Sequence, residues 1–215
     1  MARPQLSSEE IDAMRRRLTA GALEIYRREG IEAVSLRRLA EHAGISHTLL
    51  YRYFSDKAEL LAALRAECVR HFDHIVREHE ARQSDPVAKI RAIATAYVDF
   101  VGAFPDEYLM IFSPHQPAPD RHAELYAARS DLFEHAVGVI QMAIDAKRLH
   151  GDARQLTHLF WVSMHGLFTL HAAGQLVHGC GLEDLIQPLV ERMLQTPGAS
   201  VHAVDARRRH PPPST

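Results

Sequence analysis

Two short helical segments joined at a glycine, in residues 35–54, constrain this sequence more than any other feature. Residues 35–43 carry apolar side chains at steps of three and four, which is the spacing of one buried helix face. Ser35 is a good N-cap for this helix, and Gly44 allows the positive φ that a tight turn after it demands. Ser46 then caps a second, very short helix. The apolar positions are Leu36, Leu39, Ala40 and Ala43 in the first helix and Leu49, Leu50, Tyr53 and Phe54 in the second.

This spacing is that of a helix-turn-helix. In that arrangement the first helix braces across the phosphates of DNA, while the second must be short and exposed to enter the major groove. Leu50 and Phe54 lie four residues apart and are expected to face inward. The outward face then holds two tyrosines, whose exposure is costly in water and suits contacts with phosphate or sugar. The side chains expected partly or wholly outward are His47, Thr48, Leu49, Tyr51, Arg52 and Tyr53.

Helical spacing also dominates the rest of the chain, and no segment reads convincingly as a strand. Ser55 is predicted to cap a long fourth helix with Asp56 in its first turn, and Pro86 is predicted to open a fifth. A possible break near Ser130 falls within the longest helical segment. The predicted helices cover residues 11–28, 56–83, 87–103, 105–112, 121–149, 153–177 and 182–194, with a proline-rich loop at 113–120.

Composition and charge exclude several classes of protein. No run of ~18 apolar residues is present, so neither a membrane span nor a membrane partner is expected. The N-terminus lacks the apolar core of a signal peptide, which favours a cytoplasmic protein. Cys68 and Cys180 lie too far apart for a redox or zinc motif. The net charge of −2 gives no sign of a nucleic-acid partner, but residues 1–57 carry +2 and residues 58–215 carry −4. The N-terminal part is therefore mildly basic, a bias too small to identify function.

Residues 35–64, SLRRLAEHAGISHTLLYRYFSDKAELLAAL, resemble the signature of TetR-type transcriptional regulators, the TetR/AcrR family. His47 and Thr48 depart from the residues common in the family at those positions, which affects the DNA sequence that is read rather than the fold. The resemblance covers roughly residues 11–180 and is well specified only in 11–70. The matching positions of the signature are Ala40, Ala43, Gly44, Ile45, Ser46, Leu50, Tyr51, Tyr53, Phe54, Lys57, Glu59 and Leu60.

The resemblance implies an all-α chain whose N-terminal three-helix head holds the helix-turn-helix. The fourth helix would join this head to a helical ligand-binding and dimerisation domain. We expect the head at residues 11–72 with its motif at 35–54, the second domain at 84–196, and a disordered tail at 197–215. The implied function is a regulator without a cofactor, a repressor in preference to an activator. It would bind a palindromic operator in double-stranded DNA as a homodimer and leave it when a small effector binds.

The family also implies roles for individual residues of the head. Arg37 and Arg38, on the bracing helix, would reach the DNA backbone or a neighbouring base edge. Thr48 and Leu49 could contact the methyl group of thymine, and Leu49 is the weakest candidate because it could equally pack in the core. The residues that would contact phosphates are Ser35, Tyr51, Tyr53 and Lys57, and those at or in the major groove are Ser46, His47, Thr48 and Leu49.

The second half predicts a dimer and a sensor. Residues 121–149 and 153–177 are too apolar for helices that bury a single face, so a symmetric four-helix interface between two copies is the economical explanation. Trp161, His165 and Gly166 resemble the W-x-x-x-H-G element of one subgroup of TetR C-terminal domains. Aromatic and methionine side chains at helical spacing form either plain core or a pocket for an apolar or aromatic effector. The candidates are Phe72, Tyr97, Phe100, Val101, Phe104, Tyr108, Met110, Phe112, Trp161, Met164, His165 and Phe168.

Two other classes of function compete with this interpretation. The 15 histidines raise the possibility of a metal-responsive regulator, but they scatter along the chain, and a metal site needs three or four converging ligands. An enzyme is disfavoured because the chain has no G-x-S-x-G motif, no glycine-rich phosphate loop and no paired-carboxylate motif. A helical interaction module that keeps the head fold without operator binding is a further alternative. The histidines with some shared spacing are His71 and His74, with Glu78, and His158 with His165.

Overall fold

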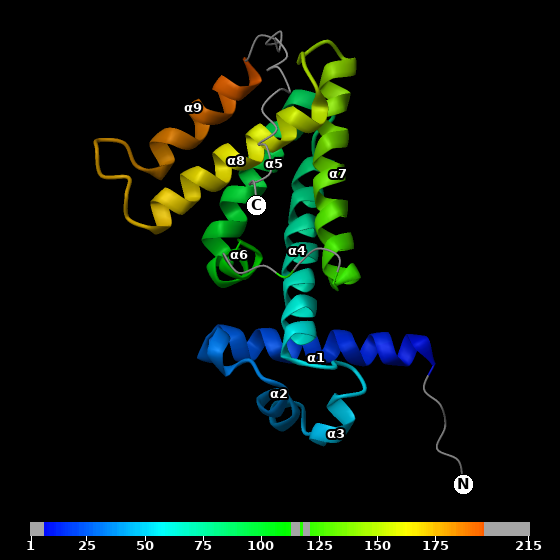
Figure 1. The fold of residues 1–215 in the computed structure, drawn as a ribbon. Coiled ribbons are helices and arrows are strands. Elements are labelled where there is room, and N and C mark those ends of the chain that lie inside the picture. Colours follow the sequence, from blue (N-terminus) through cyan, green and yellow to red (C-terminus); the bar gives the residue numbers. More distant parts are fainter. Residues whose placement is uncertain (1–6, 113–116, 118–120, 196–215) are drawn as a thin grey trace, which may run out of the picture. The chain divides into compact units, whose positions relative to one another are not determined.

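The computed structural model describes residues 7–112, 117 and 121–195, and helices are the only regular elements within them (Figure 1). The all-α prediction is therefore confirmed. The N-terminal helices are α1 (Ser8–Glu29), a 3₁₀ turn (Ile31–Ala33), α2 (Leu36–Ala43) and α3 (His47–Leu50). They are followed by α4 (Lys57–Ala81), α5 (Pro86–Ala103), α6 (Pro105–Phe112), α7 (Ala123–Asp145), α8 (Ala153–Ala172) and α9 (Leu182–Leu194).

The chain forms two compact units, residues 1–136 and residues 137–215, and α7 runs from the first into the second. In the first, α2 and α3 lie on one side of α1 and α4 to α6 extend on the other (Figure 1). In the second, α8 and α9 pack against each other as an antiparallel pair.

The head has a small apolar core built from the predicted periodicity. Leu18, Ala22 and Ile25 of α1 are at most 1% exposed, and they recur at steps of four and three on one helix face. Leu39 of α2 and Phe54, which follows α3, are fully buried in the same unit. This core fixes the position of the two short helices, which could not be stable alone.

Helices α4, α5 and α6 pack against one another and carry most of the buried aromatic side chains of the first unit. Helix α4 has 25 residues and so extends about 37 Å. The start of α5 is the predicted one, because the Asp85 side chain accepts a hydrogen bond from the Ala88 amide and Pro86 occupies the first turn.

Several helix boundaries differ from the sequence prediction. Helix α1 begins earlier, because Ser7 and Glu10 form a reciprocal capping box. The N-cap of α4 is Asp56 rather than Ser55, since the Asp56 carboxylate accepts the Glu59 amide at 2.8 Å. Helix α3 ends at Leu50, earlier than expected.

The C-terminal half shows two further differences. Helix α7 continues through Ser130 without a break. Helix α8 ends at Ala172, five residues before the predicted end, and Gly174 follows it with φ +65°. Helix α9 has the predicted bounds. The predicted tail at 197–215 and, apart from Pro117, the predicted loop at 113–120 lie outside the described residues. None of the helices within the described residues is both long and apolar enough to cross a membrane.

Candidate nucleic-acid interface

Two serine caps and one glycine build the helix-turn-helix as predicted. The Ser35 hydroxyl accepts a hydrogen bond from the Arg38 amide at 3.2 Å and so caps α2. Gly44 adopts the left-handed conformation, with φ +65° and ψ +30°, and ends that helix. The Ser46 hydroxyl accepts from the Leu49 amide at 3.2 Å and caps α3. The local hydrogen bonds of these side chains therefore set the path of the chain into the short helix.

The outward face of α3 is polar and aromatic. His47 and Thr48 are exposed, and Tyr51 just after the helix keeps 51% of its surface in solvent. The rings of His47 and Tyr51 meet edge to face at a centroid distance of 4.9 Å, so two of the predicted contact residues support each other. Leu49 is half-buried, whereas Leu50 is 1% exposed and anchors the helix in the core.

Tyr53 is the exception among the predicted contact residues. Its side chain was expected to face outward, but it is only 5% exposed. The reason is that α3 ends at Leu50, after which residues 51–53 form a turn. The turn brings both Tyr53 and Phe54 into the core, so the prediction of two exposed tyrosines is wrong for Tyr53.

The two arginines of α2 differ in their exposure and in how closely a carboxylate holds them. The Arg37 side chain is 86% exposed, and its carboxylate neighbour Glu41 lies 3.9 Å away. Arg38 instead makes two hydrogen bonds to Glu29, at 2.6 and 3.2 Å. These bonds, together with the Arg38 charge, hold the pKa of the Glu29 carboxyl below its ordinary value. Arg37 is therefore the more available of the two for a phosphate.

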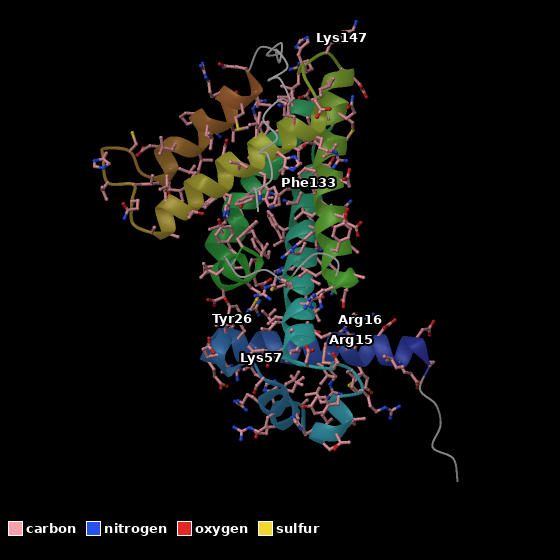
Figure 2. The ribbon with its side chains drawn as sticks, in the orientation of Figure 1. Arg15, Arg16, Tyr26, Lys57, Phe133 and Lys147 are labelled. Atoms are coloured by element: carbon pink, nitrogen blue, oxygen red, sulfur yellow. The ribbon has the colours of Figure 1, made fainter. Side chains whose placement is uncertain are left out.

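Lys57 lies at the first position of α4 and is exposed. The helix dipole favours negative charge at this end, where the Asp56 carboxylate already takes one amide, and the lysine adds a full positive charge. Arg16 and Arg17 of α1 and Arg52 are exposed as well. Figure 2 labels Arg16 on α1 and Lys57 at the start of α4.

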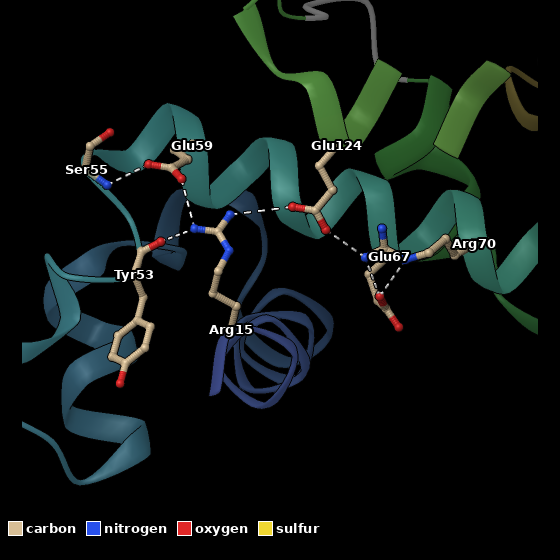
Figure 3. Close-up of polar contacts among 7 residues, drawn as sticks. All are labelled: Arg15, Tyr53, Ser55, Glu59, Glu67, Arg70 and Glu124. Carbon is tan, nitrogen blue, oxygen red and sulfur yellow. Dashed lines mark hydrogen bonds and ion pairs between the residues drawn. The ribbon is translucent and has the colours of Figure 1, made fainter. Parts of the chain in front are cut away.

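Arg15 is a positioning residue that the sequence analysis missed. Unlike its exposed neighbours Arg16 and Arg17, Arg15 has a side chain that is only 24% exposed. Figure 3 shows its guanidinium donating to the main-chain carbonyl of Tyr53 and, at 2.9 Å, to Glu59. The spacing of three from buried Leu18 is the signal that could have revealed it.

Two further contacts hold Arg15, and a third holds its partner Glu59. Its guanidinium carbon lies 4.6 Å from the centre of the Phe54 ring, a cation–π arrangement. Glu59 also accepts the Ser55 amide at 2.7 Å; burial raises the pKa of this carboxyl, but the hydrogen bonds from Ser55 and Arg15 outweigh that effect and lower it overall. Glu124 of α7 lies 3.5 Å from Arg15 and accepts from Arg70 at 3.0 Å (Figure 3). The turn between α3 and α4 is thus held by α1.

The structure brings six of the predicted effector residues together in the first unit. We refer to them as the aromatic cluster. Phe72 lies 4.7 Å from Phe100 and 5.2 Å from Tyr97, measured between ring centroids. Burial raises the pKa of the Tyr97 hydroxyl, which therefore stays protonated. The aromatic cluster consists of Phe72 on α4, Tyr97, Phe100 and Phe104 at α5 and its C-cap, and Tyr108 and Phe112 on α6.

Two further candidates, Val101 on α5 and the buried Met110 on α6, also lie in the first unit, and the other effector candidates lie on α8, in residues 137–215. Met164 and Phe168 are at most 4% exposed. His165 is half-buried, and burial lowers its pKa, so the neutral imidazole is favoured. Trp161 keeps 43% of its surface exposed. These four residues share one face by spacing.

No group of three or more His, Cys, Asp and Glu side chains that the structure describes could hold a metal ion. His71 and His74, which the sequence placed near Glu78, have separate partners: His71 binds Glu107 at 2.8 Å, and His74 lies 3.6 Å from Glu78.

Two family models match this chain. Residues 18–64 match the model described as bacterial regulatory proteins, tetR family, and residues 90–196 match the tetracyclin repressor-like C-terminal domain. The transcriptional activator FasR of Mycolicibacterium smegmatis is 27% identical over 160 residues, which are 64% of this chain and 72% of FasR. The transcriptional regulator BetI of Yersinia pestis is 33% identical over 87 residues, which are 40% of this chain and only 44% of BetI.

Solved structures agree at the level of the fold. A protein of unknown function from Rhodococcus sp. RHA1 aligns with a TM-score of 0.72 at 26% identity, covering 84% of this chain and 93% of that one. A TetR/AcrR-family regulator from Thermobifida fusca aligns with a TM-score of 0.60 at 17% identity, covering 85% and 97%. The chain therefore belongs to the TetR family of transcriptional regulators, DNA-binding proteins of the helix-turn-helix type rather than enzymes.

Proposed function

We propose that this protein is a ligand-responsive repressor that binds a palindromic operator as a homodimer and is released by a small apolar or aromatic effector. The observation that carries the proposal is the exposed polar face of α3, with His47, Thr48 and Tyr51 presented on a helix whose ends are capped and whose exit turn is fixed. A side-chain face of this kind suits base edges and phosphates, because it offers donors, acceptors and a methyl group on a rigid support.

The proposed contacts follow from exposure. Tyr51, Lys57 and Arg37 bind phosphates, together with Arg38 on α2 and Ser35 at the N-cap of that helix. The residues proposed at or in the major groove are Ser46, His47, Thr48 and Leu49. Tyr53 is left out of the contact set because its side chain is buried.

A second copy is proposed to cover the apolar face of α8. Leu159, Val162 and Leu170 are 50%, 65% and 49% exposed, and their spacing places them within one helix face. Such a stripe is costly in water and suits a symmetric interface. A dimer would present two α3 helices to half-sites about 34–36 Å apart, one turn of DNA.

The effector is proposed to act at the aromatic cluster. Six rings whose only side-chain polar groups are the buried hydroxyls of Tyr97 and Tyr108 favour an apolar or aromatic molecule over a charged one. The W-x-x-x-H-G subgroup, suggested by Trp161, His165 and Gly166, is part of the same proposal.

DNA selection followed by titration tests the function. A duplex is selected from a random library by the full-length protein, and its affinity is measured by fluorescence anisotropy between 50 and 200 mM salt. We expect an inverted repeat and a steep loss of affinity with salt, because phosphate contacts release counterions. A monomer in light scattering would show that the apolar face of α8 does not form a dimer interface. The absence of an enriched sequence would exclude operator binding.

A further inference from the structure

A buried carboxylate joins three helices on the side of α1 that faces away from α2 and α3. Glu107, in the first turn of α6, is 1% exposed. Its two oxygens have different partners: Oε1 accepts from Arg27 of α1, and Oε2 lies 2.8 Å from Nδ1 of His71 on α4. Loss of a partner from a buried carboxylate costs much free energy, so the three helices are expected to keep these contacts when one of them moves.

A neighbouring hydrogen bond reinforces the link between α1 and α6. The Tyr26 hydroxyl donates to the main-chain carbonyl of Asp106 at 3.0 Å. Figure 2 labels Tyr26 near the C-terminal end of α1. Two consecutive residues of α1, Tyr26 and Arg27, therefore bind two consecutive residues of α6, and the end of α1 follows any movement of the first turn of α6.

His71 connects the same carboxylate to the aromatic cluster. Its ring lies edge-on to Phe104, with centroids 4.6 Å apart, and to Phe100 at 5.8 Å. One part of the ring contacts the cluster while Nδ1 contacts Glu107. A change in the packing of Phe104 cannot leave His71 in place without a gap, because protein interiors are close-packed.

We propose that Glu107 is a positioning residue that couples the aromatic cluster to the DNA-reading head through His71 on one side and Arg27 on the other. The proposal deepens the proposed function and rests on it for the identity of the effector site. Helix α1 transmits the shift to the helix-turn-helix, because Leu18 and Ile25 form the core under α2 and Arg15 holds the turn after α3. A shift at the cluster then reaches α3 through α1 and not only through α4.

Hydrogen exchange with DNA tests the coupling without a known effector. The full chain is compared with and without the duplex selected by the wild-type protein, since coupling between two sites must act in both directions. In the wild type, DNA is expected to slow amide exchange at α2 and α3 directly. Coupling should also slow exchange at residues 97–104 and 105–112 by about fivefold or more, the lower end of typical coupling.

Arg27→Gln is the main variant, because the Arg27 side chain is 43% exposed and its replacement disturbs packing less than a change at the buried Glu107. We expect Arg27→Gln to keep the slowing at α3 and to lose it at residues 105–112. Arg28→Gln removes the same charge from the next residue of α1, which is exposed, and should behave as the wild type. Glu107→Gln should resemble Arg27→Gln if it folds.

His71→Gln separates the two arms of the link. It keeps a polar group toward Glu107 but removes the ring beside Phe104, so we expect slowing at residues 105–112 to persist and slowing at 97–104 to disappear. Slowing at α3 without any at residues 105–112 in the wild type would overturn the coupling, as would full slowing there in Arg27→Gln. Absence of slowing at α3 itself would instead contradict operator binding.

Discussion

Helices α3 and α8 each carry a group of exposed side chains, but the chemistry of the two faces differs. Around α3 the exposed groups are His47, Thr48 and Tyr51, each with a polar atom. On α8 they are Leu159 and Val162, which have none. The contrast indicates that exposure alone says little: a polar aromatic face suits phosphates and bases, and an aliphatic face suits another apolar surface.

A charge on the α8 face should give the largest effect. Val162→Asp is expected to convert the dimer into a monomer and to weaken operator binding by about 100-fold or more, because the two half-sites then bind independently. Light scattering and anisotropy measure the two effects. Val177→Asp is the control, since Val177 is 69% exposed but lies outside the stripe. A dimeric Val162→Asp would contradict the interface.

Loss of the Arg15 contacts should have the next largest effect. Arg15→Gln removes the hydrogen bonds to the Tyr53 carbonyl and Glu59 and the stacking on Phe54. The free energy of unfolding is therefore expected to fall by about 1–3 kcal/mol. Arg16→Gln, on the exposed side, should stay within about 0.5 kcal/mol. Urea unfolding compares the variants, and equal midpoints for both would remove Arg15 from its positioning role.

The exposed face of α3 should affect which sequence is bound more than how tightly. Thr48→Ala and His47→Ala are expected to relax preference at single base pairs by about 1 kcal/mol each. Lys57→Gln should weaken all sequences equally and lower the slope of log affinity against log salt by about 1. A repeated selection with each variant measures this, and unchanged preference with Thr48→Ala and His47→Ala would place α3 outside the groove.

The smallest expected effect is in the acid stability of the head. The folded-state pKa of Glu59 lies below its ordinary value of 4.5, so its stabilising contribution is complete above that value and is lost as the pH falls through the lower, folded-state pKa. Glu59→Gln should therefore be less stable at pH 7 and lose less stability below about pH 4.5. Thermal melts between pH 7 and pH 3 measure both slopes, with exposed Glu32→Gln as the control, and parallel slopes would refute the assignment.

Local signals were sufficient for most of the fold. The caps at Ser35 and Ser46, the glycine turn at Gly44 and the bounds of α9 follow from residues within four positions of one another, and the structure has them as predicted. The end of α8 was misplaced because Leu176 and Val177 continue the apolar spacing beyond Gly174, which ends the helix.

The missed parts of the site depend on long-range contacts. Arg15 and Glu59 are separated by 44 positions, and Arg27 and Glu107 by 80, so no local pattern relates them. Tyr53 was misplaced for a similar reason: helical spacing alone extended α3 past Leu50, whereas packing turns the chain inward.

The bond from Arg15 to the carbonyl oxygen at position 53 has a consequence for how such a head can change its target. Because the acceptor is a main-chain oxygen, this hydrogen bond does not depend on which side chains α3 carries before position 53. Residues 47 and 48 can therefore be exchanged without disturbing the Arg15 contact behind them. The exposed face of α3 and the contact that holds the following turn can vary separately, both in evolution and in the laboratory.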